Sequence, residues 1–131
     1  VTFMYPLSVD EWINFESQGD NIRSWDQMMN RVAYFHSKYD FPNPINKGHD
    51  MGYRISLTVE ELGEFAAAIT KGKPVQEAAE ELADLLILIL GHSLALEIDL
   101  FNEFNKKIDR VIQRPVRHTK LGIRVTDYKD E

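Results

Sequence analysis

Two pairs of acidic residues that lie close together in the chain are the residues best suited to do chemistry. The first pair is Glu61 and Glu64, and the second is Glu81 and Asp84. Residues three apart share a face of an α-helix, so each pair directs two carboxylates to one place. Such a cluster is costly without counter-charge, and hard divalent cations with oxygen ligands suit it best. We therefore expect the four carboxylates to form one Mg²⁺ site, in which Mn²⁺ can substitute.

The segment between the two pairs predicts how they meet. Lys71-Gly72-Lys73-Pro74 ends one helix and begins the next, because proline suits the first helical turn. Helices joined by so short a turn usually pack antiparallel. We expect helices over 53–70 and 74–96, with the carboxylates converging across their seam. The alternative without a metal is that the acidic residues form the solvated end of an amphipathic helix. The second helix carries no charge from Leu85 to Leu96, which indicates a largely buried helix and argues against this alternative.

Apolar residues at helical spacing predict further helices. One covers residues 24–39, and we interpret its apolar stripe as core rather than as a base-stacking surface. Another covers residues 100–113, and a short one covers residues 9–17. The predicted organisation is all-α, with an N-terminal extension (1–23), one helical domain (24–115) and a charged, partly extended tail (116–131).

Composition excludes several classes of protein. The chain has 131 residues, of which 44% are hydrophobic, enough for the core of one domain. The absence of cysteine excludes disulfides, thiolate catalysis and Cys-ligated zinc. The longest uncharged apolar run is too short to span a bilayer, and we find no secretory signal. We therefore expect a cytoplasmic protein without a membrane partner.

The charge distribution suggests the kind of substrate. The net charge of −6 argues against binding to nucleic acid polymers. Residues 60–84 contain seven acids and two lysines, whereas residues 102–124 contain seven basic residues and two acids. Acids that hold cations and bases that meet phosphates together suit a metal-bound polyphosphate. The candidate phosphate contacts are Lys71, Lys73, Lys107, Arg110 and Arg114.

Four residues near the acidic pairs have candidate roles. Arg54 lies near the start of the first acidic helix, where it can pair with a carboxylate or bind phosphate. His92 lies two turns beyond Asp84 on nearly the same side, and is either a satisfied core histidine or a pocket-wall contact to substrate. Hydrolysis of a phosphate chain needs a base that orients water. Glu61 or Glu60 can fill that role, and the sequence leaves the choice open.

The sequence Glu60-Glu61-Leu-Gly-Glu64, followed by Glu80-Glu81-Leu-Ala-Asp84, resembles the paired motif of the MazG-like nucleoside triphosphate pyrophosphohydrolases. This all-α superfamily is related to dimeric dUTPases and phosphoribosyl-ATP pyrophosphohydrolases. The resemblance runs from about residue 31 to residue 114. It implies Mg²⁺-dependent cleavage of a nucleoside triphosphate between the α- and β-phosphates, a nucleotide-pool house-cleaning activity. The metal ligands that it implies are Glu61, Glu64, Glu81 and Asp84.

The resemblance also concerns assembly and the last helix. It implies a homodimer or homotetramer in which helices of two subunits complete a four-helix core. The apolar faces around Leu82–Ile89 and Phe101–Ile108 independently predict a homo-oligomer, because one chain is too short to cover both. Relatives often carry an asparagine in the last helix to hold the nucleotide, where this chain has Val111, while Arg114 keeps their basic residue three positions later.

Two other readings compete with the pyrophosphohydrolase. A di-iron four-helix bundle needs Glu-x-x-His pairs, and none of the four histidines follows an acid by three residues. A helical dimer that binds Mg²⁺ or nucleotide without turnover stays open, because of Val111. Within the enzyme class, no residue decides between a canonical dNTP, dUTP, a damaged nucleotide and phosphoribosyl-ATP.

Overall fold

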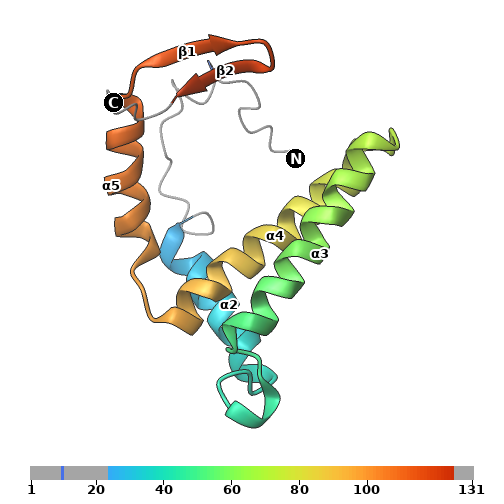
Figure 1. Cartoon of the computed structure of the whole chain (residues 1–131). Helices are drawn as coiled ribbons and strands as arrows, with labels where there is room; N and C mark the ends of the chain where they lie inside the picture. Colours follow the sequence, from blue (N-terminus) through green and yellow to red (C-terminus); the bar gives the residue numbers. More distant parts are fainter. Residues whose placement is uncertain (1–9, 11–23, 126–131) are drawn as a thin grey trace, which may run out of the picture.

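The computed structural model describes Asp10 and residues 24–125 (Figure 1). In chain order, the elements are α2 (Trp25–Lys38), the 3₁₀ turn η2 (Pro44–Asn46), α3 (Met51–Thr70), α4 (Val75–Leu96), α5 (Leu100–Ile112), β1 (Val116–Thr119) and β2 (Gly122–Val125). The chain is mainly helical, as predicted. Apart from Asp10, the predicted extension and its short helix lie outside the described residues, as does the tail after residue 125.

The helices begin where side chains can cap them. Ser24, Asp50 and Asp99 each accept a hydrogen bond from a backbone amide three residues later, at the starts of α2, α3 and α5. Pro74 immediately precedes α4. Gly72 adopts a φ of 64°, which lets the chain reverse between α3 and α4. Each helix therefore starts within two residues of its predicted position.

An antiparallel hairpin of α3 and α4 is the most extensive packing among the described elements (Figure 1). Helix α2 crosses the end of α4 that lies away from the hairpin turn. The apolar side chains buried here are few and mostly small: Val32, Ala68, Ala78 and Leu90. Although α4 is apolar over most of its length, no helix in the described ranges is long and apolar enough to cross a membrane.

Large apolar side chains stay exposed along two helices. On α4 they include Leu82, Leu86 and Ile89, and on α5 they include Phe101 and Phe104. Helix α5 is strongly amphipathic but buries none of its residues. Because exposed apolar area is unfavourable in water, these faces are suited to contact a second copy of the chain.

Residues 116–125 form an antiparallel β-hairpin, an element that the all-α prediction did not include. Arg117 lies opposite Arg124 across the two strands. The Thr119 hydroxyl donates to the carbonyl of Gly122 and accepts from its amide, and Gly122 has a φ of 140°. Pro115 precludes continuation of α5, and β-branched residues then favour strands.

We predict a homo-oligomer, at least a dimer, because one chain leaves the apolar face of α5 uncovered. Light scattering at micromolar concentration is expected to give a mass of two chains or more. Phe104→Glu, on a side chain that is 58% exposed, should lower that mass by placing charge in the interface. Leu121→Glu in the exposed hairpin turn should not. A wild-type mass of one chain would contradict the prediction.

Candidate metal centre

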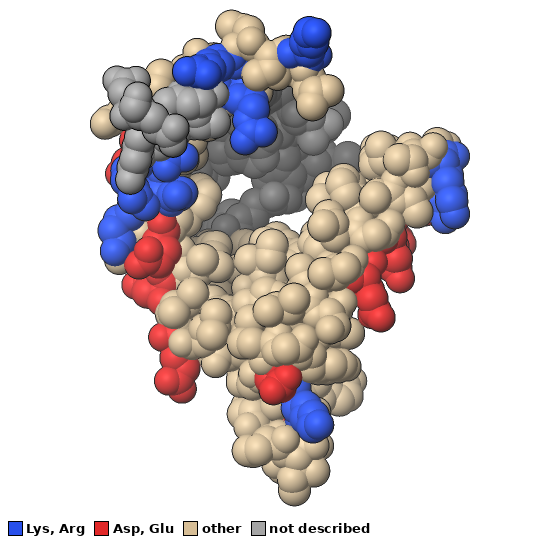
Figure 2. Space-filling view, in the orientation of Figure 1, with Lys and Arg blue, Asp and Glu red and all other residues tan. Residues whose placement is uncertain are grey.

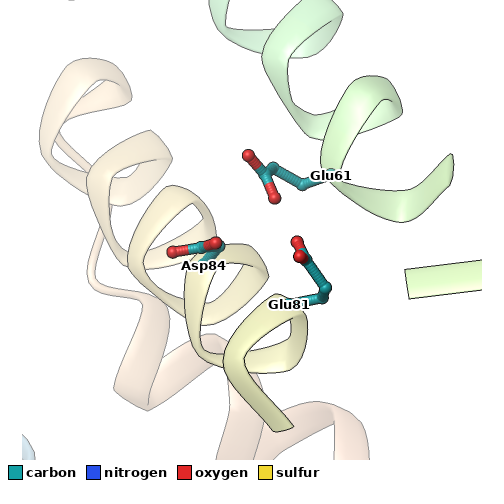
Figure 3. Close-up of side chains that lie close together, drawn as sticks. All are labelled: Glu61, Glu81 and Asp84. Atoms are coloured by element: carbon teal, nitrogen blue, oxygen red, sulfur yellow. The ribbon is translucent and has the colours of Figure 1, made fainter. Parts of the chain in front are cut away.

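Three carboxylates from two helices face one another in the α3–α4 seam. Glu61 comes from α3, whereas Glu81 and Asp84 come from adjacent turns of α4 (Figure 3). One oxygen of each carboxylate lies within 4.8 Å of the other two. A cation placed between them would need only small side-chain movements to bind all three, since oxygen ligands lie about 2.0–2.6 Å from Mg²⁺ or Ca²⁺.

Two oxygen atoms of this trio are buried without a hydrogen-bond partner. They are Oε2 of Glu61 and Oε2 of Glu81. A buried carboxylate oxygen that has lost its water is costly unless it is compensated. A divalent cation supplies that compensation, so the residues present fit a metal such as Mg²⁺.

The cost of bringing these carboxylates together also appears in the pKa of Glu61. With both carboxyls ionised these oxygens have no donor, whereas a proton on one carboxyl lets Glu61 and Glu81 share a hydrogen bond. That hydrogen bond is the main cause that raises the pKa of Glu61 to about 7. Burial and the negative charges of Glu64, Asp84 and Glu81 raise this pKa further. Without a cation, Glu61 therefore binds a proton near neutral pH, and a cation would have to displace it.

Glu64, the fourth predicted ligand, does not belong to the trio. It is exposed on α3, one turn beyond Glu61, and its charge is felt at the Glu61 carboxyl. Glu60, the alternative candidate for general base, is also exposed on α3, whereas Glu61 is half-buried. The structure thus brings three of the four predicted ligands together and leaves Glu64 beside them.

Arg54 requires a correction, because the structure uses its side chain inside the fold. Only 2% of Arg54 is exposed. Its guanidinium donates to His92 Nδ1 (3.0 Å), to the Gly48 carbonyl (2.9 Å) and to the Leu88 carbonyl (3.1 Å). It forms no ion pair within the described part of the chain, so the predicted pairing with a carboxylate is not seen and its donors are taken up inside the fold. The reason is packing, since α2, α3 and α4 enclose it.

His92 also points into the fold. Its Nδ1 accepts from Arg54, and its Nε2 lies 2.8 Å from Thr58 Oγ1. Both ring nitrogens thus have partners in the seam. Of the two predicted alternatives for His92, this geometry matches the satisfied core histidine.

The remaining candidate phosphate contacts lie at two distant places. Lys71 and Lys73 are exposed at the α3–α4 turn, and Lys73 Nζ lies 3.7 Å from the Glu77 carboxylate. Lys107 and Arg110 line a cavity of about 660 Å³ between α4 and α5. Figure 2 shows basic atoms over the C-terminal end of α5, over the hairpin and at the tip of the α3–α4 arm, and acidic atoms both on that arm and along α5. Arg114 borders a shallow pocket beside Arg110.

A second cavity reaches the metal centre, and the sequence did not reveal it. Its volume is about 500 Å³, and Asp84 forms part of its wall. Arg31 is its one basic lining residue within the described chain; the others are Met28, Val32, Phe35, Leu86, Ile87 and Leu90. An amphipathic stripe looks the same whether it fills a core or lines a cavity, so the helical spacing could not distinguish them. The cavity shares its Leu86 and Leu90 walls with the one that Lys107 and Arg110 line.

A protein-family comparison covers the segment that contains these carboxylates. The model of the MazG nucleotide pyrophosphohydrolase domain family matches residues 53–118. That range is just over half of the chain, and it includes all the carboxylates discussed above. No curated protein and no solved structure matches the chain. With its predicted all-α core and paired acidic motif, the chain belongs to the MazG nucleotide pyrophosphohydrolase domain family.

Proposed function

We propose that the protein hydrolyses a nucleoside triphosphate to a nucleoside monophosphate and pyrophosphate with the help of Mg²⁺. The observation that carries the proposal is the trio of Glu61, Glu81 and Asp84, which includes two buried oxygen atoms without partners. These residues would hold the cation, and exposed Glu64 would complete the ligand set. When bound, the cation would neutralise phosphate charge and activate water.

Glu61 is the better candidate for the general base. It lies within the cluster, whereas Glu60 is exposed on α3. Glu61 would therefore orient a water molecule toward the phosphate chain and accept its proton.

The two neighbouring cavities suit the two ends of such a substrate. The cavity beside Asp84 combines apolar and aromatic walls with Arg31, which suits a nucleoside next to a phosphate. Lys107 and Arg110 line the adjoining cavity, where they would bind phosphate oxygens. Lys71, Lys73 and Arg114 remain further candidates for phosphate contacts.

The runner-up is a protein that binds Mg²⁺ and nucleotide without turnover. Val111 favours it, because this residue is half-buried on α5 and offers no polar group where relatives often carry asparagine. A screen for pyrophosphate release with Mg²⁺ separates the two functions. Its panel should contain canonical dNTPs, dUTP, damaged nucleotides and phosphoribosyl-ATP, which also tests the related pyrophosphohydrolase activity.

We expect Glu81→Gln and Asp84→Asn to abolish pyrophosphate release, because each removes a charged metal ligand. Circular dichroism should show intact helices. The melting temperature without metal should be unchanged or higher, since repulsion within the trio falls. Glu80→Gln, which changes an exposed residue outside the trio, is the matched control. Near wild-type turnover in both ligand variants would rule out a catalytic trio.

The proton on Glu61 makes stability without metal depend on pH. The pKa of Glu61 is raised from an ordinary 4.5 to about 7 in the folded protein. The folded state therefore holds this proton more tightly than the unfolded state. The stability it contributes is complete below pH 4.5 and is lost as pH rises to about 7. In EDTA, the melting temperature should fall over this window relative to that of Glu61→Gln.

The comparison with Glu61→Gln is essential, because His36 acts in the opposite direction. Burial lowers the pKa of His36 to about 4, so its effect on stability grows more favourable as pH rises over an overlapping range. Mg²⁺ should raise the melting temperature of the wild type more at pH 8 than at pH 5.5, where it must displace the proton. A wild type and a Glu61→Gln variant with parallel pH profiles would contradict the raised pKa.

We expect Arg110→Ala to lower kcat/KM by about tenfold or more, since charge-assisted hydrogen bonds contribute about 1.5–3 kcal/mol. The loss should be similar for two different nucleotides, because a phosphate contact does not read the base. Lys38→Ala, at an exposed position of α2, is the control for the loss of a positively charged surface side chain. An unchanged kcat/KM in Arg110→Ala would remove this residue from the phosphate site.

A further inference from the structure

Arg54, Thr58 and His92 form a closed ring of hydrogen bonds in the same seam as the carboxylate trio, one to two helical turns away from it. A guanidinium only donates, so the 3.0 Å contact between Arg54 Nε and His92 Nδ1 makes Nδ1 the acceptor. Burial and the charge of Arg54 lower the pKa of His92, consistent with a neutral ring. Its proton is then on Nε2, which donates to Thr58 Oγ1 at 2.8 Å. The Thr58 hydroxyl donates in turn to the Arg54 carbonyl at 2.9 Å.

This ring joins the two helices that carry the trio. Arg54 and Thr58 belong to α3, whereas His92 belongs to α4. Arg54 also reaches across the seam to the carbonyl of Leu88. Thr58 precedes Glu61 by three residues, so on α3 the ring begins one helical turn from the trio. On α4 the Leu88 carbonyl, which accepts from Arg54, lies one turn beyond Asp84, and His92 lies two turns beyond it.

The surroundings leave Arg54 little freedom to move. Gly91 of α4 lies against its guanidinium, and a Cβ atom built on Gly91 would come within 2.8 Å of His36 Nε2 and closer still to Arg54. His36 comes from α2, and its Nδ1 lies 2.8 Å from Nε2 of His49. Helix α2 therefore closes the third side of the guanidinium, and the ring is held as a rigid unit.

We propose that Arg54, Thr58 and His92 are positioning residues that fix the register of α3 against α4, and thereby keep the trio ready for a cation. Carboxylates held this close repel one another and favour separation of their helices. The hydrogen bonds of the ring oppose that movement near the trio, because they are directional, whereas apolar contacts are not. The inference rests on the proposed metal centre.

Mn²⁺ binding to the full chain, followed by electron paramagnetic resonance well below the melting temperature, tests the inference. Thr58→Val keeps the shape of the side chain but removes one of the two hydrogen bonds that link His92 to α3. We expect it to weaken Mn²⁺ binding about tenfold, as for other residues that orient metal ligands. Thr58→Ser restores the hydroxyl and should restore the affinity.

Ser56→Ala is the matched control. Ser56 donates to the carbonyl four residues before it, as Thr58 does, but its side chain makes no hydrogen bond across the seam within the described residues. It should leave Mn²⁺ affinity unchanged. If Thr58→Val lowers the melting temperature but binds Mn²⁺ with wild-type affinity, the positioning role is overturned and the metal centre is not. A wild type that binds no Mn²⁺ would overturn both the metal centre and this inference.

Discussion

Repulsion between three carboxylates in one helix seam is the constraint on which the rest of the structure depends. Glu61, Glu81 and Asp84 lie within 4.8 Å of one another, and two of their oxygens are buried without partners. Either a proton or a cation must lower that cost. The raised pKa of Glu61 shows the first solution, and family membership points to the second. The long antiparallel pairing of α3 and α4 provides the frame that resists separation.

The seam also buries the positively charged guanidinium of Arg54, which forms no ion pair with the acidic residues described. Arg54 is satisfied by two backbone carbonyls and a neutral histidine rather than by a carboxylate. An ion pair with the trio would occupy oxygens that a metal needs. The fold thus uses neutral acceptors for its internal cation and leaves the carboxylates available, with a cavity opening beside Asp84.

The sequence predicted the features that local chemistry controls. Helix limits followed from caps and from the Gly72–Pro74 turn, and the spacing of the acidic pairs correctly placed three carboxylates together. The predicted pairing of Arg54 with a carboxylate is not seen, because its partners at Gly48, Leu88 and His92 are set by packing between helices, which periodicity does not encode. The cavity beside Asp84 was missed for the same reason. The hairpin escaped notice because strands of four residues carry little pattern.

The β1–β2 hairpin has a consequence for the behaviour of the protein at high concentration. Both strands are exposed throughout, and within the described residues each strand pairs only with the other. Such edges are templates for further strands and hence for fibrous aggregates. Arg117 and Arg124 sit opposite each other on this ribbon, and charged side chains on strand edges are a common protection against such pairing.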